Sequence, residues 1–446
     1  MPSDADRLFR TDPADVHAVI ASRMLADGYD FVFDAERSHG ARLADAKTGR
    51  EYVDLFSFFA SMPVSFDHPG LKDPLFLARL QACAVHRPTN SDVYTTAMAD
   101  FVATFSRTLP PAYKHLFFID GGTLAVENAL KTAFDWKVQK NLRRGLPETC
   151  GLQIAHFRQA FHGRSGYCLS LTNTFDPRKT KWFPKFDWPR LPAPKLRFPV
   201  DERVLEETRR VEDLAISELE RHLVARPFEI AAVVVETIQG EGGDNHFRPE
   251  FFRRLRDLCD AEEMLLVFDE VQCGFGLTGT WWAFEQFGVE PDVFAFGKKT
   301  QTCGIAANGR VDDVDSVFKA PSRINSTWGG NLVDMVRCTR YVEIIEQDRL
   351  LENVREVGAY ALERLGALTG EFPDRVSNVR GRGLMCAFDL PSAAERDRLK
   401  NVLEEDGVIV LGCGERSIRF RPVLDLTRAD ADLAVDRLAS GLRRLG

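Results

Sequence analysis

Five short apolar runs, separated by stretches with helical periodicity, constrain the fold of this chain more than any other feature. The runs cover residues 116–119, 153–157, 231–235, 264–268 and 293–296. They are rich in Val, Ile, Leu and Phe, and they do not alternate between apolar and polar positions. Such runs are typical of strands that are buried on both faces, as in parallel sheets covered by helices. We therefore predict an α/β fold whose ligand lies beyond the carboxyl ends of the strands.

The chain is also long enough for a second lobe, because 446 residues exceed what one hydrophobic core usually organises. Amphipathic helices are predicted at 124–138 and 249–263, a helical region from 331 to 368, and an early helix and strands at 13–27, 31–33, 42–45 and 52–56. A strand, a helix, two strands and a helix follow at 376–390, 393–405, 408–411, 418–423 and 429–445. We predict an N-terminal segment (1–75) contributing to the small lobe, a large domain (76–325) and a small α+β domain (326–446).

Composition narrows the range of partners and compartments. The net charge of −8 offers no broad basic field for a nucleic acid. No apolar run approaches the roughly 18 residues that span a membrane, and residues 1–12 are polar, unlike a targeting peptide. Nine scattered cysteines without a CxxC pair predict neither a disulfide framework nor a zinc site. We expect a cytoplasmic protein without a bound metal.

Three polar features follow predicted strands of the large domain. Gly121, Gly122 and Thr123 come after 116–119 and open a helix, so they form either an anion site or an ordinary capped turn. Asp269 follows 264–268, and a buried carboxylate there needs a cationic partner, either a ligand or a structural salt bridge. Lys298 follows 293–296, as a reactive amine or as half of a solvated basic pair.

Taken together, the three features match the phosphate, ring nitrogen and aldehyde of pyridoxal 5'-phosphate (PLP), with the lysine as a Schiff base. Two other motifs are weaker. The GxGxxG pattern at 274–279 lies several residues past its strand, and no helix is predicted at its third glycine. The sequence at 297–300 lacks the earlier glycine of a phosphate-binding loop, because Asp292 stands in that position.

From about residue 15 to 445 the chain resembles class III (subgroup II) aminotransferases of fold type I. The most telling segment is Asp269-Glu270-Val271-Gln272, followed 29 positions after the aspartate by Lys298. Asp292 stands six residues before Lys298, a spacing that favours this lysine over Lys299. Within the class, residues 161–167, 183–189, 238–244, 296–301 and 325–331 resemble the lysine 6-transaminases. The resemblance implies that residues 76–325 bind PLP.

The resemblance also implies roles for individual residues. Lys298 would be the Schiff-base and proton-transfer lysine, and Asp269 would pair with the ring nitrogen. Thr327 would reach the phosphate bound to the other subunit, which implies an obligate homodimer. Thr123 departs from the alanine of the relatives but keeps its backbone N–H. The remaining residues expected to bind the cofactor are Gly122, Thr123, Phe161, His162, Glu236 and Gln272.

The implied reaction transfers the ε-amino group of L-lysine to 2-oxoglutarate, giving 2-aminoadipate 6-semialdehyde and glutamate by a ping-pong mechanism. The expected substrate-binding residues are Arg164, Glu241, Asn325 and Arg419. Arg164 would hold the α-carboxylate of lysine, and Arg419 would hold 2-oxoglutarate. Glu241 would pair with Arg419 while lysine is bound and then swing away, unless the two form a static salt bridge. Arg419 is preferred over Arg421 because it stands three residues before Pro422.

Three alternatives remain open. The nearest is another class III ω-aminotransferase, acting on ornithine, 4-aminobutyrate or a diamine with the same cofactor apparatus. A PLP mutase or racemase of the same fold would need no 2-oxoglutarate. A relative that has lost its chemistry and serves as a binding protein would have no use for Lys298 and Asp269.

Overall fold

The computed structural model describes residues 9–445, and its largest element is a seven-stranded sheet. All of its strands are parallel except β10, which runs antiparallel to both of its neighbours. The prediction of a mostly parallel α/β sheet is confirmed. In spatial order the strands are β4 (Tyr113–Ile119), β10 (Cys303–Asn308), β9 (Val293–Phe296), β8 (Leu265–Asp269), β7 (Ile230–Glu236), β5 (Gln153–Phe157) and β6 (Arg190–Leu191).

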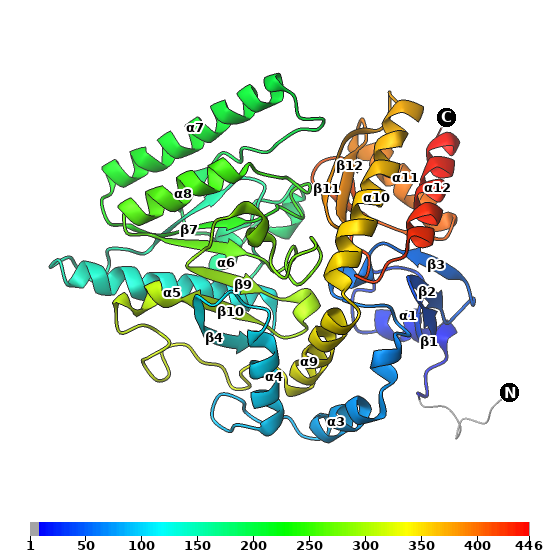
Figure 1. The fold of residues 1–446 in the computed structure, drawn as a ribbon, viewed down its shortest axis with the longest axis horizontal. Coiled ribbons are helices and arrows are strands. Elements are labelled where there is room, and N and C mark those ends of the chain that lie inside the picture. The colour runs from blue at the N-terminus through cyan, green and yellow to red at the C-terminus, as the bar shows by residue number, and fades with distance from the viewer. Residues whose placement is uncertain (1–8, 446) are drawn as a thin grey trace.

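Helices cover both faces of this sheet (Figure 1). Successive residues of β7 show the two faces, because Val233 packs in one core and Val234 in the other. The first core includes Phe252 of α8, and the second includes Ala129 of α5. Burial on both faces explains why the strands read as unbroken apolar runs. The helices of this region are α4 (Thr96–Ser106), α5 (Gly122–Leu142), α6 (Gly166–Leu171), α7 (Glu202–Ala225) and α8 (Pro249–Ala261).

The N-terminal part forms a small sheet with one strand from the far end of the chain. Strand β13 (Val408–Ile409) pairs in parallel with β3. The helix expected at 13–27 is shorter than predicted, since α1 ends at Ala21 and buries no residue that could extend it by packing. The elements are η1 (Pro13–Asp15), α1 (Val16–Ala21), β1 (Phe33–His39), β2 (Arg42–Asp45), β3 (Glu51–Asp54), α2 (Ser57–Ala60), η2 (Pro69–Lys72) and α3 (Pro74–Ala84).

The C-terminal lobe contains a four-stranded sheet in the order β11-β12-β15-β14. The single strand expected at 376–390 is instead a hairpin that turns at Gly383, where φ is +55°. The strand expected at 408–411 divides between two sheets as β13 and β14. The elements are α9 (Leu332–Gln347), α10 (Leu350–Glu371), β11 (Ser377–Arg382), β12 (Met385–Asp389), α11 (Ala393–Glu405), β14 (Leu411–Cys413), β15 (Ser417–Phe420) and α12 (Arg428–Arg444).

Some predictions are not tested by this architecture. The domain boundaries at 75 and 325 stay predictions. Residues 1–8, part of the segment from which a targeting peptide was judged absent, lie outside the described residues. Within residues 9–445, no helix is both long enough and apolar enough to cross a membrane.

Candidate active site

The chemistry-bearing residues meet at the carboxyl edge of the parallel strands. Asp269 and Glu236 are the last residues of β8 and β7, and Lys298 follows β9 by two residues. A cavity of about 300 Å³ opens at this edge. It is lined by Gly122, Thr123, Phe161, His162, Gly163, Arg164, Glu236, Asp269, Val271, Gln272 and Lys298. The sheet therefore assembles most of the predicted site in one place.

Asp269 lies at the buried end of the cavity and is held by two hydrogen bonds. Its Oδ2 lies 2.8 Å from Nδ1 of His162, and its Oδ1 accepts a hydrogen bond from the backbone N–H of Val271 at 3.0 Å. Burial alone would lower the pKa of His162, but the hydrogen bond and charge of Asp269, with the charge of Glu236, raise it overall. The pair favours the imidazolium form of His162, and the two hydrogen bonds fix the orientation of Asp269.

Glu236 supports the loop that follows β5. Its Oε1 accepts from the backbone N–H of Phe161 at 2.8 Å, and its Oε2 accepts from the backbone N–H of Gly240 at 2.9 Å. Desolvation raises the pKa of this carboxyl to about 7. Glu236 thereby positions Phe161, whose aromatic ring lines the cavity.

The two adjacent lysines have different environments. Lys298 lines the cavity, whereas Lys299 turns away and donates to the carbonyls of Met62 at 2.8 Å and Pro422 at 3.3 Å. Burial lowers the pKa of Lys298, although the charge of Asp269 partly opposes the shift. Lys298 also adopts a left-handed backbone conformation, with φ +54°, which is strained for a residue with a Cβ. An amine that loses its proton easily at the cavity wall is suited to imine formation and proton transfer.

The part of the cavity wall at the start of α5 is suited to an anion. Helix α5 begins at Gly122, and Gly121 before it has φ +101°, a conformation that favours glycine. The first N–H groups of a helix are free to bind an oxyanion and lie at its positive end. Thr123 lies close by, with its Oγ1 2.8 Å from Oγ of Ser165. A Cβ on Gly163 would lie 2.1 Å from Oγ1 of Thr123, so only glycine fits beside this cradle.

Arg419 and Arg421 both donate to Gln272, but only Arg421 also has a carboxylate partner. Nη1 of Arg419 donates to Oε1 of Gln272 at 2.7 Å, and its buried Nε has no hydrogen-bond partner among residues 9–445. Arg421 is fully buried and forms a two-pronged ion pair with Asp244, in which Nη1 lies 2.9 Å from Oδ2. Arg421 is thus a structural residue, and Arg419 retains a donor for a ligand.

Glu241 is not paired with Arg419 in this structure but contacts two other residues. Its Oε1 lies 2.6 Å from Nζ of Lys179 and accepts from Oγ1 of Thr174 at 2.6 Å. The buried Oε2 has no partner in the described part of the chain. The static Glu241–Arg419 salt bridge that the sequence left open is therefore absent from this structure of residues 9–445.

Four of the predicted site residues do not line this cavity: Glu241 and Arg419, described above, and Asn325 and Thr327. Asn325 lines a separate cavity beside Asn90, and Thr327 is exposed. The segment that carries them is tied to residues 90 and 91, since Oγ of Ser91 donates to the carbonyl of Ser326 at 2.7 Å. Within one chain, then, neither residue reaches the cofactor end of the cavity.

Sequence reasoning missed several supporting residues. Lys179 and Thr174 bind Glu241, and Asp244 neutralises Arg421. No sequence signal marks such pairs, because each joins segments far apart in the chain. The GxGxxG pattern at 274–279 lies in a run of turns, and no helix opens there, so it does not form a dinucleotide site.

The residues fit PLP on their own chemistry. The N-terminus of α5 is available for the phosphate, the Asp269 carboxyl group for the ring nitrogen, an aromatic ring for stacking, and the Lys298 amine for the aldehyde. Within residues 9–445 no cluster of three or more metal-ligating side chains occurs.

Comparisons with known proteins agree with this geometry. Residues 24–442 match the family Aminotransferase class-III. The chain is 52% identical to an L-lysine-epsilon aminotransferase of Mycobacterium tuberculosis, in an alignment that covers 97% of this chain and 96% of that protein. It is 51% identical to an L-lysine-epsilon aminotransferase of Amycolatopsis lactamdurans, with 98% of this chain and 97% of that protein covered. A solved lysine aminotransferase from M. tuberculosis, in its internal aldimine form, superposes with a TM-score of 0.95 at 52% identity, over 98% of this chain and 100% of that one. The chain therefore belongs to the class-III aminotransferases, enzymes whose cofactor is pyridoxal 5'-phosphate.

Proposed function

We propose that this enzyme transfers the ε-amino group of L-lysine to 2-oxoglutarate, releasing 2-aminoadipate 6-semialdehyde and glutamate by a ping-pong mechanism. The observation that carries the proposal is a cavity lined by a reactive amine, Lys298, and by Arg164, with a second arginine, Arg419, bonded to its lining residue Gln272. Relatives about half identical over nearly the whole chain are named L-lysine-epsilon aminotransferases, which supports lysine as the donor.

The residues would divide the chemistry as follows. When bound, PLP supplies the aldehyde and the electron-withdrawing ring that let an amino group leave one substrate and join the other. Nζ of Lys298 moves the proton to and from the substrate carbon that carries the amine, helped by burial that lowers its pKa. Asp269, oriented by His162, keeps the ring nitrogen protonated, and Phe161 stacks on the ring. Gly122 and Thr123 hold the phosphate, and Gln272 reaches the phenolic oxygen.

Substrate choice would depend on charge. Arg164 is exposed at the cavity and would bind the α-carboxylate of lysine, so that the distant ε-amine points to Lys298. The unpartnered Nε of Arg419 would receive the second carboxylate of 2-oxoglutarate. While lysine is bound, Glu241 would leave Lys179 and neutralise Arg419. The present arrangement, with Glu241 on Lys179, supports an enzyme ready for the acceptor.

A donor screen tests the substrate assignment. Purified holoenzyme is given 2-oxoglutarate with lysine, ornithine, 4-aminobutyrate or a diamine, and glutamate is measured. We expect the largest kcat/KM with lysine, and a product that carries the aldehyde at the former ε-carbon. Glutamate from ornithine or 4-aminobutyrate but not from lysine would reject lysine as the donor and leave the aminotransferase activity intact. Loss of amine without need for 2-oxoglutarate would favour a mutase or racemase.

We also propose an obligate homodimer in which Thr327, with Asn325, completes the site of the partner subunit. Three observations support it. Thr327 and Asn325 are exposed, neither lines the cavity of its own chain, and the ring of Trp328 beside them is 46% exposed, with the Arg87 guanidinium 3.8 Å from its centre.

Subunit mixing tests this sharing. Lys298→Ala and Thr327→Asp proteins are each expected to be nearly inactive. Refolded together, they should recover about a quarter of wild-type activity per subunit, since half of the random dimers pair one of each chain and contain one intact site. No recovery, with mixed dimers confirmed by mass, would place Thr327 at the site of its own chain.

A cytoplasmic location is the last part of the proposal. All nine cysteines are free, which fits a reducing compartment. Fractionation of the source cells with an antibody to the enzyme would test it.

A further inference from the structure

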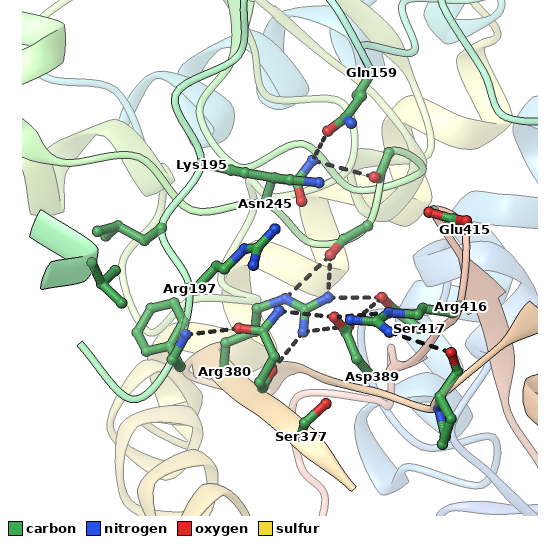
Figure 2. A pocket seen from close by; sticks show the side chains of 18 of the residues that line it. Gln159, Lys195, Arg197, Asn245, Ser377, Arg380, Asp389, Glu415, Arg416 and Ser417 are labelled. Atoms are coloured by element: carbon green, nitrogen blue, oxygen red, sulfur yellow. Dashed lines mark hydrogen bonds and ion pairs between the residues drawn. The ribbon is translucent and has the colours of Figure 1, made fainter. Parts of the chain in front are cut away.

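A second cavity, of about 580 Å³, shares no lining residue with the catalytic cavity. It is bounded by the segment 195–204, which leads into α7, by the loop at Gly242 and Gly243, by β11 and the end of β12, and by the turn 414–417. Figure 2 shows this space, with Lys195 drawn level with Asn245, and Arg197 below it and above the Arg380–Asp389 cluster. Its volume is within the usual range for small-molecule sites.

The charged side chains around this cavity are predominantly basic. Five cations line it against three acids. The cations are Lys195, Arg197, Arg203, Arg380 and Arg416, and the acids are Asp201, Asp389 and Glu415. A cleft lined with an excess of one sign concentrates ions of the opposite sign.

Two of the acids are already committed to other partners. Asp389 accepts hydrogen bonds from Oγ of Ser417 at 2.6 Å and Nδ2 of Asn378 at 3.0 Å, and pairs with Nη1 of Arg380 at 2.9 Å. Asp201 caps α7 by accepting from the N–H of Val204 at 2.7 Å. They are therefore poorly placed to neutralise the remaining cations of the cavity.

Lys195 and Arg197 are the cations left over. Within residues 9–445, neither side chain has a hydrogen bond or an ion pair. Lys195 is half-buried, and burial lowers the pKa of its amine; the charges of Asp389 and Glu415 partly offset that shift, while Arg380 and Arg197 add to it. A basic group held in a partly desolvated space near two guanidinium groups is stabilised by an added anion.

The backbone adds positive potential at the same place. The first turns of α7 and α11 contribute Arg203, Val204 and Ala393 to the cavity wall. The positive ends of both helix dipoles thus lie at the cavity that holds the unpaired cations.

We infer that this cavity is a binding site for a small dianion, a dicarboxylate or a phosphate compound, held by Lys195 and Arg197. The site is separate from the substrate clamp at Arg419 and does not depend on which amine the enzyme uses. Its wall is continuous with the loop that carries Glu241. Nε of Arg380 donates to the carbonyls of Gly243 and Asp244 at 3.2 and 3.0 Å, and the N–H of Gly414 donates to the carbonyl of Glu241 at 2.7 Å. A bound anion would thus contact the segment that carries Glu241.

Calorimetric titration of the holoenzyme tests the inference, with inorganic phosphate and malonate as probes. These anions could also bind at Arg419, so the titrations use an Arg419→Gln protein, and the visible absorption of the cofactor reports any change at the catalytic site. We expect saturable binding of at least one probe, with the cofactor spectrum unchanged. Binding of phosphate alone would identify a phosphate compound as the ligand, and binding of malonate alone a carboxylate.

Introducing Lys195→Gln and Arg197→Gln into the Arg419→Gln protein should weaken this binding by about a hundredfold. Each hydrogen bond from a charged donor contributes about a factor of ten to the affinity. The matched control is Arg209→Gln with Arg210→Gln, which removes the same charge from the exposed face of α7, where these arginines pair with Glu202 and Glu206. The control should bind both probes unchanged. Equal affinity in the Lys195/Arg197 variant, or no saturable binding of either probe to the Arg419→Gln holoenzyme, would overturn the inference. Wild-type holoenzyme, titrated in parallel, guards against a folding defect in the Arg419→Gln background.

Discussion

Asp269→Asn is the substitution that most directly tests the proposed catalytic electrostatics. Asparagine has nearly the same shape, so it can keep an oxygen for the N–H of Val271 while losing the charge that His162 meets at 2.8 Å. Without that charge, burial dominates and the pKa of His162 falls. The pKa of Lys298 falls further as well, because Asp269 is the strongest influence that raises it.

The expected effect on rate is large. A fixed charge that stabilises a developing charge in a site that excludes water contributes about 100- to 1,000-fold to kcat, or roughly 3–4 kcal/mol. The effect on folding is smaller, because a charged hydrogen bond is replaced by a neutral one, a difference of about 1 kcal/mol. We therefore expect kcat for lysine to fall by two to three orders of magnitude at nearly unchanged thermal stability, with an altered pH dependence of the cofactor spectrum.

The assay follows glutamate formation, together with cofactor absorbance from pH 6 to 9. Asp292→Asn is a matched control, since Asp292 is equally buried, before β9 at the opposite edge of the sheet, and pairs with Nη1 of Arg256 at 2.9 Å. The control should lose stability but keep its cofactor spectrum and its kcat per bound cofactor. An Asp269→Asn enzyme with kcat within about threefold of wild type would refute the role assigned to Asp269.

Three further predictions concern individual residues. Lys298→Ala should lose the covalent, borohydride-reducible attachment of the cofactor, and Lys299→Met should retain it, as measured by mass spectrometry. The reverse result would assign the Schiff base to Lys299. Glu241→Ala should leave the charge of Arg419 without a neutralising partner while lysine binds. The KM for lysine should therefore rise about tenfold or more, with a smaller effect on the KM for 2-oxoglutarate. Unchanged steady-state kinetics for both substrates would rule out the proposed movement of Glu241 between Lys179 and Arg419. Burial raises the pKa of Glu236 from 4.5 to about 7, so the folded protein binds this proton more tightly than the unfolded chain does. Protonation of Glu236 therefore stabilises the fold fully below pH 4.5, and this stabilisation is lost as pH rises through 7. The free energy of unfolding of Glu236→Gln, measured in urea, should therefore rise relative to that of wild type by up to about 3 kcal/mol between pH 4.5 and 7. A difference between the two proteins that does not change with pH would contradict the raised pKa.

The strands of the large sheet were predictable because their environment is uniform. Residues buried on both faces must all be apolar, and the runs at 153–157 and 293–296 coincide with β5 and β9. Strand β10 was not predicted, since its Cys-Gly-Ile-Ala-Ala-Asn sequence is short of large apolar residues. The split of 408–411 was also missed, because pairing of β13 with β3 joins segments about 350 residues apart.

The sequence allowed us to predict the grouping of the residues expected to bind the cofactor, but not the contacts of those expected to bind the substrates. Lys298, Asp269 and the turn before α5 follow strands whose order places them at one edge, so spacing along the chain was enough. The partners of Glu241 and Arg421 depend on how loops from distant segments fold over that edge. Local sequence carries little information about such contacts.

By itself, the sequence determined the α/β class and the sheet edge at which Asp269, Lys298 and the turn before α5 meet, because local sequence patterns show which strands are buried and where they end. The tertiary structure decided which charges meet. It pairs Arg421 with Asp244, leaves a donor of Arg419 without a partner, holds Glu241 on Lys179 and leaves Lys195 and Arg197 unpaired within residues 9–445. The physical reason is that an ion pair forms only within a few ångströms, and only the folded chain fixes distances between residues far apart in sequence.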